Sequence, residues 1–364
     1  MVRIAFLGDV GFVGRYEIRS GDVKARLSAL KQELEKYDYV VCNLETPLTS
    51  KTTTRKCKAW HLRADTDNVQ TLKWLGVNAV NLANNHTFDY GKTAVKETIR
   101  ILEHNGIEWF GVFGKTLDVC SEDNKLCFSG YNCLSTHGHG YSKRNRGISI
   151  LTYDMLKRQR KKDAERGFFS VMFCHWGVEF THFPEKYHIL IAHGVMNHGN
   201  CALIGSHPHY IQGMETSGKK NSFCAYSLGN GIYDEVESNS GIQNVPFMEE
   251  NKKMLLLSLS FQCNHIVESE IFGWYHGSEY LHKTEIKNEI MKYSKALHGI
   301  VDWDAYQSVR EMERSEYFNG QRIVRDFNWL KSRMNYNMIG GKIREMIIDR
   351  KLKKERLKLF KCAE

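Results

Sequence analysis

The sequence predicts an α/β domain followed by a helical, basic C-terminal extension. Short apolar runs alternate with segments of helical spacing, which is the pattern of strands joined by helices. After about residue 277 the chain becomes polar and rich in Lys, Arg and Glu. We therefore place the first domain at residues 1–275 and the extension at residues 276–364.

Five apolar runs have the length and composition of buried strands. They lie at residues 2–7, 39–42, 79–82, 168–174 and 202–204. Helical spacing is found at residues 23–36, 68–75, 92–104 and 185–198. Residues 254–262 and 266–275 predict a β-hairpin that closes the domain, whereas residues 114–145 show neither periodicity and are expected to be irregular.

The composition is that of a globular protein. Of 364 residues, 42% are hydrophobic and 26% are charged, so disordered and collagen-like classes are excluded. No apolar run reaches the length of a membrane span, and Asp9 interrupts the first run too early for a signal peptide. The 10 cysteines include no Cys-x-x-Cys, and they predict reduced thiols, buried for the most part in strand-like runs, and a cytoplasmic location. The cysteines in or beside these runs are Cys42, Cys174, Cys201, Cys224 and Cys263.

The positive charge is concentrated in the C-terminal tail. Residues 342–361 contain nine Lys or Arg and three Asp or Glu, a local charge of +6 out of the total of +9. We therefore predict no specific nucleic-acid partner for the main body. Ile339, Ile343, Met346 and Ile347 form an apolar stripe in this tail. The stripe could pack on its own domain, or it could lie on an anionic membrane at the inner face.

Polar side chains follow each predicted strand. Because ligands bind at the carboxyl ends of strands in α/β sheets, we expect these groups to converge on one crevice. Carboxylate, amide and imidazole groups are ligands for divalent Mn, Zn or Fe. Two ions that share a carboxylate fit so many donors better than one tetrahedral ion does. The residues concerned are Asp9, Asn43, Glu45, Asn85, His86, His175, His207 and His209.

Six motifs in order resemble the CapA family, which is linked to poly-γ-glutamate capsule synthesis and related to calcineurin-like metallophosphoesterases. The resemblance implies a four-layer αββα sandwich over roughly residues 1–275 and a metal-dependent hydrolase site. The motifs are Gly8-Asp9, Asn43-Leu44-Glu45-Thr46-Pro47-Leu48, Leu82-Ala83-Asn84-Asn85-His86-x-x-Asp89-Tyr90-Gly91, His175-Trp176-Gly177-x-Glu179, His207-Pro208-His209 and Tyr226-Ser227-Leu228-Gly229-Asn230.

The resemblance also implies a role for each residue. One metal ion would be held by Asp9 and His209 and the other by Asn85, His175 and His207, with Glu45 as the bridging carboxylate. His86 would be the general acid, oriented by Asp89. Glu179 would hydrogen-bond His175 and hold its ring in place. Asn43 and Asn230 would line the site, and Trp176 would contact substrate or support the ligands from behind. The family's relatives carry a His two residues after the first Asp, where this chain has Gly11.

Several functions remain open at this stage. Metal-activated water could attack a phosphoester or, given the capsule link, an amide or isopeptide centre. A non-catalytic component that binds an acidic polymer or a membrane partner is the rival hypothesis. A γ-glutamyl ligase or transferase is a third, although the chain has no Gly-x-x-x-x-Gly-Lys phosphate loop. His175 and Trp176 could also be an ordinary packed pair.

Overall fold

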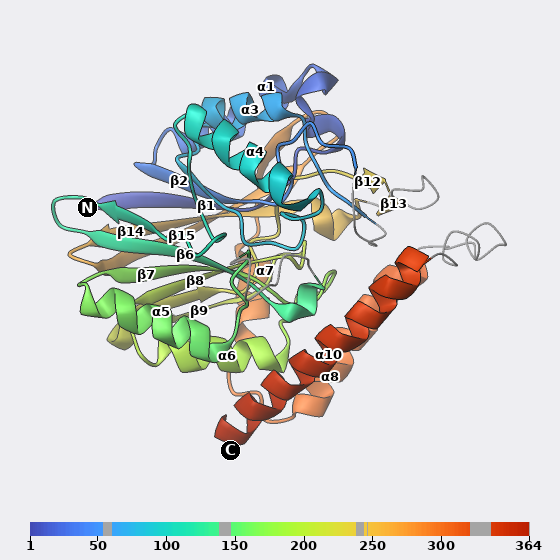
Figure 1. Ribbon diagram of the computed structural model, residues 1–364. Coiled ribbons are helices and arrows are strands. Elements are labelled where there is room, and N and C mark those ends of the chain that lie inside the picture. Colours follow the sequence, from blue (N-terminus) through green and yellow to red (C-terminus); the bar gives the residue numbers. More distant parts are fainter. Residues whose placement is uncertain (54–59, 138–146, 238–243, 246, 321–335, 364) are drawn as a thin grey trace.

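The computed structural model describes residues 1–53, 60–137, 147–237, 244–245, 247–320 and 336–363. Two β-sheets stack face to face, and helices cover the outer face of each sheet (Figure 1). This is the four-layer αββα arrangement that we expected. The domain boundary near residue 275 stays a prediction.

The first sheet is built around the N-terminal strand. Its eight strands run in the order β16-β15-β14-β1-β2-β3-β4, with β11 paired to β1 beyond the end of β14. Strands β1 to β4 are parallel, whereas β14 runs antiparallel to β1 and forms the predicted hairpin with β15. The bounds are β1 Val2–Val10, β2 Tyr39–Leu44, β3 Ala79–Asn81, β4 Glu108–Phe110, β11 Asn230–Ile232, β14 Lys253–Gln262, β15 His265–His276 and β16 Leu281–Thr284.

The second sheet has six strands in the order β5-β6-β7-β8-β10-β9. The bounds are β5 Leu117–Cys120, β6 Lys125–Asn132, β7 Phe169–His175, β8 Cys201–Ser206, β9 Met214–Ser217 and β10 Ser222–Ala225. A separate pair, β12 (Val236–Glu237) and β13 (Asn244–Val245), lies outside both sheets.

The segment expected to be irregular contains β5 and β6, so that expectation was wrong. Ser129 and Gly130 interrupt the apolar run of β6, which hides the strand from a periodicity argument. Gly130 is required there because a Cβ would come within 2.0 Å of the Asn81 side-chain oxygen. The two sheets therefore approach closely at Gly130, where a side chain would not fit.

Helices form the outer layers. On the first sheet lie α1 (Val23–Arg26), α2 (Ser28–Leu34), α3 (Val69–Leu75) and α4 (Gly91–His104), and on the second lie α5 (Tyr153–Glu165) and α6 (Lys186–Met196) (Figure 1). The single helix expected at residues 23–36 is divided at Leu27. Single 3₁₀ turns are η1 Gly14–Tyr16, η2 Ile18–Ser20, η3 Thr66–Asn68, η4 Leu134–Thr136, η5 Gly218–Lys220 and η6 Glu249–Lys252.

The core between the sheets is aromatic. The Phe6, Phe110, Phe128 and Phe173 rings pack with centroid separations of 5.2 to 6.5 Å. Such close packing of buried rings holds the two sheets in a fixed relation. It therefore fixes the distance between side chains that project from the ends of different sheets.

Among the described residues, the helices α7 (Lys287–Lys295), α8 (Trp303–Gly320) and α10 (Tyr336–Ala363) follow the last strand. Helix α10 packs along α6 and η4 (Figure 1) through the buried side chains of Ile348 and Leu352. Ile343, Met346 and Ile347, which we expected in one apolar stripe, are exposed. The fourth residue of that stripe is Ile339, whose side chain lies outside the described residues. In the described chain, every helix is too short or too polar to span a bilayer.

Most cysteines behave as expected. Cys42, Cys174, Cys201 and Cys224 are buried free thiols within strands. Cys263 is exposed, because it lies in the turn between β14 and β15, so the expectation of burial was wrong for this residue.

Candidate metal centre

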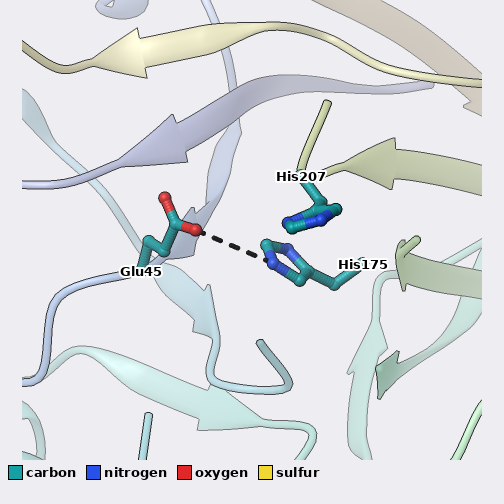
Figure 2. A group of neighbouring side chains, drawn as sticks. All are labelled: Glu45, His175 and His207. Atoms are coloured by element: carbon teal, nitrogen blue, oxygen red, sulfur yellow. Dashed lines mark ion pairs between the residues drawn. The ribbon is translucent and has the colours of Figure 1, made fainter. Parts of the chain in front are cut away.

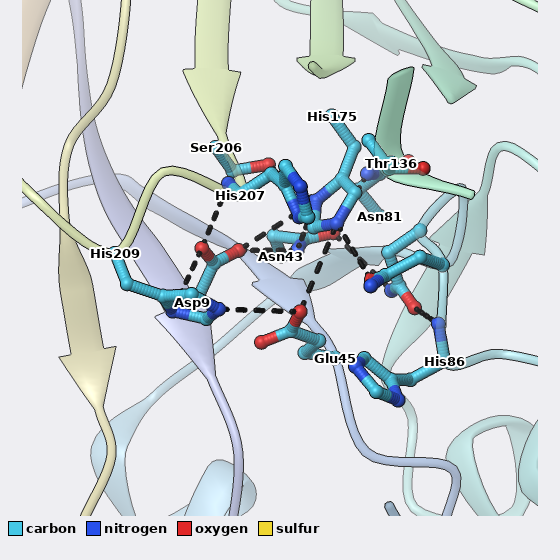
Figure 3. A network of polar contacts seen from close by, with 12 residues as sticks. Asp9, Asn43, Glu45, Asn81, His86, Thr136, His175, Ser206, His207 and His209 are labelled. Atoms are coloured by element: carbon cyan, nitrogen blue, oxygen red, sulfur yellow. Dashed lines mark hydrogen bonds and ion pairs between the residues drawn. The ribbon is translucent and has the colours of Figure 1, made fainter. Parts of the chain in front are cut away.

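The candidate residues come from the ends of strands in both sheets. Asp9 lies in β1, Glu45 follows β2, His175 ends β7, and His207 and His209 follow β8. Parallel strands bring their carboxyl ends to one edge, and the stacking of the sheets brings the two edges together. Figure 3 shows the resulting network, in which side chains more than a hundred residues apart lie in contact.

Asp9 is fixed by hydrogen bonds at both carboxylate oxygens. The Asn43 amide donates to Oδ1 at 2.6 Å, and the His207 backbone N–H donates to Oδ2 at 2.9 Å. Gly8 allows this arrangement, since a Cβ there would lie 2.0 Å from the Gly229 carbonyl oxygen and would push β11 away. Burial raises the pKa of Asp9, although the charge of His209 and the hydrogen bonds oppose the shift. A nearby cation would therefore be favourable.

Glu45 is a buried carboxylate at the centre of the site. Its side chain is buried, and Oε1 lies 3.7 Å from Nε2 of His175 (Figure 2) and 3.9 Å from Nε2 of His209. Tyr233 is a hydrogen-bonding neighbour of this carboxylate, but no described residue donates to either oxygen with good distance and angle. Burial and the charge of Asp9 raise the pKa of Glu45 to about 8. Because a buried carboxylate is costly without a partner, this position suits a divalent cation.

His175 is held at both ring nitrogens. Nε2 lies 2.9 Å from Oδ1 of Asn85, and Nδ1 lies 2.9 Å from the hydroxyl of Ser206. The His207 ring packs against it with a centroid separation of 4.8 Å. Neutral hydrogen-bonding groups therefore orient this imidazole before any ion is bound.

His207 and His209 occupy unusual backbone conformations. Their φ angles are +97° and +57°, in a region that side-chain-bearing residues rarely adopt. Such strain is typical of residues that are held for a function. Nδ1 of His209 lies 2.8 Å from Oδ1 of Asn230. Burial would lower the pKa of His209, but the charges of Glu45 and Asp9 outweigh burial and raise it.

Three groups of side chains offer ligand atoms within 4.8 Å of one another. They are Asp9 with Glu45 and His209, Glu45 with His175 and His207, and Glu179 with His207 and His209. Glu45 belongs to the first two groups, as a bridging carboxylate would. Imidazole and carboxylate donors at this spacing fit Mn, Zn or Fe, so the residues present suit a pair of divalent ions.

Glu179 lies close to two histidines of the site, and its predicted support of His175 stays a prediction. The structure groups its carboxylate with His207 and His209. His207 also belongs to the group of Glu45 and His175, whereas His209 belongs to the group of Asp9 and Glu45. Glu179 is thus positioned to supply a donor beside these two histidines, and its role stays a prediction.

His86 and Asp89 form the expected pair. Nδ1 of His86 lies 2.7 Å from Oδ2 of Asp89, which also accepts a hydrogen bond from the Leu62 backbone N–H at 3.0 Å. Asn84 accepts hydrogen bonds from the backbone N–H groups of His86 and Thr87 and so fixes the loop after β3. The His86 ring is therefore oriented by a buried carboxylate.

Trp176 does not line the site, and the alternative that it supports the site from behind stays a prediction. The strand alternation turns this side chain away from His175 and into the core, where it stacks on Tyr226 and donates from Nε1 to the Tyr226 carbonyl at 2.9 Å. Trp176 therefore supports β7 by packing and does not contact the crevice.

Sequence reasoning missed several polar residues around the site. Asn81 donates to Oδ1 of Asn43 at 2.8 Å, which leaves the Asn43 amide group aimed at Asp9. Tyr233 lies with its ring 5.1 Å from that of His209. Asn81 could have been found, because an amide within a three-residue buried strand demands a partner. Tyr233 follows β11 and gives no comparable signal.

These features define an α/β sandwich protein with a candidate two-metal centre at the edges of both sheets. Residues 3–235 match the family model of the bacterial capsule synthesis protein PGA_cap, and the chain belongs to this family.

Two curated relatives are similar to this chain. The capsule biosynthesis protein CapA of Bacillus anthracis is 29% identical over 215 residues, which are 56% of this chain and 52% of the relative. The PGA biosynthesis protein CapA of Bacillus subtilis (strain 168) is 25% identical over 249 residues, 64% of this chain and 63% of the relative. The chain thus spans about half to two thirds of the length of these relatives.

Solved structures show weaker likeness. A putative 5'-nucleotidase of Staphylococcus aureus has a TM-score of 0.47 and 13% identity, covering 82% of this chain and 59% of that one. A calcineurin-like phosphoesterase of Bacillus subtilis has a TM-score of 0.39 and 13% identity, covering 86% of this chain and 99% of that one. Because both TM-scores are below 0.5, the family assignment rests on sequence alone.

Proposed function

We propose that this protein is a metal-dependent hydrolase of the phosphoesterase type that acts in capsule polymer synthesis. The observation that carries the proposal is Glu45, a buried carboxylate placed between two groups of histidines and lacking good hydrogen bonds. Without a cation this arrangement costs folding energy, and with two cations it becomes a bridging ligand.

The proposed chemistry divides between metal and protein. A bound metal pair lowers the pKa of water and stabilises negative charge on the reacting centre. Asp9, Glu45 and the three histidines would hold that pair, while Asn43 and Ser206 hold Asp9 and His175 in place. His86 would donate a proton from Nε2 to the leaving group, since Nδ1 faces Asp89.

Two substrate classes are compatible with this site. A phosphoester fits the two-metal arrangement most directly. An amide or isopeptide bond is the second candidate, because the relative in Bacillus subtilis is named for PGA biosynthesis. A non-catalytic role in polymer binding is the rival from another class, and it would retain the fold without turnover. Cytoplasmic location stays a prediction.

The test uses purified full-length protein, stripped with chelator and reloaded with Mn. We expect bound metal by elemental analysis and hydrolysis of a generic phosphodiester. His207→Ala should lose metal and turnover together, whereas His86→Ala should keep the metal and lose about 10²- to 10⁴-fold in rate. His104→Ala, a change of an exposed histidine on α4, is the matched control and should behave as wild type.

The outcomes separate the hypotheses. Metal without turnover on phosphodiesters or γ-glutamyl amides would favour the binding role. No metal in the wild type, or equal metal in the wild type and His207→Ala, would contradict the proposed site.

A further inference from the structure

Helix α10 has two sides with different contacts. On its inner side, Ile348 and Leu352 are buried in the core formed with α5 and α6. Arg356 donates to Glu185 at 2.7 Å, and Asp349 pairs with His137 at 2.9 Å. These contacts fix which side of the helix faces the protein.

The outer side carries apolar side chains. Ile343, Met346, Ile347 and Leu357 are 54%, 57%, 48% and 51% exposed. At 3.6 residues per turn these positions fall on one side, about half a turn from Ile348. Four exposed apolar side chains on one helix face form a patch, and a helix face that only meets water is usually polar.

The charges on α10 are also sorted by side. Five of the basic, exposed residues are Lys342, Arg350, Lys351, Lys353 and Lys354; of these, Arg350, Lys353 and Lys354 lie among the outer apolar side chains, and Lys342 and Lys351 lie at the two edges of that side. The acidic residues of this segment, Glu345, Asp349 and Glu355, fall on the inner half. In the part of the chain that the structure describes, no carboxylate pairs with any of the five basic side chains. Within residues 342–360, the centre of the outer side therefore carries basic and apolar side chains and no acidic residue.

We propose that this outer side of α10 docks the protein on an anionic lipid bilayer. Aliphatic side chains can enter the boundary between headgroups and acyl chains while the interleaved cations meet acidic headgroups. A second copy of the chain is a poorer occupant, because a two-fold contact would bring the five cations of each copy together. Nucleic acid is also a poorer occupant, because its phosphates would bind the cations but would not bury the aliphatic side chains.

The docking helix is connected to the candidate metal centre. Leu359 and Phe360 of α10 pack in the same cluster as Trp303 and Tyr306 of α8. Farther along α8, Tyr317 stacks on Phe180 at 3.8 Å, and Phe180 stacks on His209 at 6.4 Å. Docking through α10 would therefore place an element that borders the candidate site close to the membrane.

The experiment is co-sedimentation of the full-length protein with vesicles. We expect binding to vesicles of phosphatidylcholine mixed with phosphatidylglycerol, little binding to phosphatidylcholine alone, and weakening by salt. The triple change Arg350→Gln, Lys353→Gln and Lys354→Gln should weaken binding by about 100-fold, at about 1 kcal/mol per cation. Ile343→Ser with Met346→Ser and Ile347→Ser should weaken it even at low salt, because the apolar contribution is lost.

The matched control removes the same charge elsewhere. Lys73→Gln, Lys96→Gln and Arg100→Gln alter exposed cations on α3 and α4, in the opposite outer layer, and should leave binding unchanged. Equal binding by the α10 variants and the control, or no binding by the wild type, would overturn the proposal. Concentration-dependent dimers that Ile343→Ser, Met346→Ser and Ile347→Ser abolish, without vesicle binding, would instead identify a second copy as the occupant. Metal content reports the candidate site separately and should not change in any of these variants.

Discussion

The two halves of the candidate metal centre, one around His175 and one around His209, differ in the hydrogen bonds and donors of their side chains. On the His175 side, Asn85 and Ser206 orient the imidazole through both ring nitrogens. On the His209 side, both oxygens of Asp9 already accept hydrogen bonds, and Gly11 stands where related phosphoesterases carry a histidine. A metal ion would replace an existing hydrogen bond on both sides, at Nε2 of His175 and at Asp9, so the halves differ in the donor that Gly11 does not supply. We therefore expect the ion on the His175 side to be held more tightly.

The largest effect is expected from Glu45→Gln, since both halves share this residue. Activity should fall by about 10³-fold or more, and neither ion should bind with measurable affinity. The metal-free variant should be more stable than metal-free wild type, because a buried ionisable group is replaced by a neutral one of the same shape. Thermal unfolding with chelator and with Mn measures both effects. A variant that is still stabilised by Mn as the wild type is would show that Glu45 binds no metal.

The second prediction compares the halves directly. His209→Ala should retain roughly one ion per chain, and His175→Ala should retain less, with affinity reduced by about 100-fold. Isothermal titration of chelator-treated protein gives both stoichiometry and affinity. The comparison fails if His209→Ala loses more metal than His175→Ala does.

The third prediction concerns Glu179, which the structure groups with His207 and His209. Glu179→Gln should weaken the looser ion by about tenfold and leave the tighter ion unchanged. Glu122→Gln, at an exposed position between β5 and β6, is the control. If Glu179→Gln weakens only the tighter ion, then Glu179 supports His175, as we predicted from the sequence.

The smallest expected effect is the pH dependence of the protein's stability. The pKa of Glu45 is about 8 in the folded chain, against a usual value of 4.5, so the folded state binds this proton more tightly than the unfolded state does. Stability of the metal-free protein should therefore decrease as the pH rises from about 5 to about 8. Metal displaces the proton, so stabilisation by Mn should increase over the same range. Unfolding temperatures measured with chelator and with Mn test both trends. A metal-free protein that becomes more stable as the pH rises, or a stabilisation by Mn that decreases, would contradict the prediction.

Much of the site could be predicted because its residues follow recognisable strands. Asp9, Glu45, His175 and His209 each come at the end of a short apolar run, and parallel strands bring such ends together. The second-sheet strand β6 could not be predicted, because Ser129 and Gly130 interrupt its apolar pattern. The side on which Trp176 lies could not be predicted, because a period of two sends neighbouring side chains to opposite faces, and the sequence alone does not say which face lines the crevice.

The extension was harder to interpret than the sheets. The sequence shows an apolar stripe at Ile343, Met346 and Ile347, yet the buried contacts are made by Ile348 and Leu352. A helix with apolar residues on two opposite sides has no unique inward face, and only tertiary packing selects one.

The central claim is that Glu45 is shared by two ions, and electron paramagnetic resonance of the Mn-loaded protein tests it most directly. Two Mn ions bridged by one carboxylate are magnetically coupled, so the wild type should give a coupled spectrum when fully loaded. Glu45→Gln should not give this spectrum at the same Mn concentration. An uncoupled, single-ion spectrum from fully loaded wild type, or a coupled one from Glu45→Gln, would contradict the shared site.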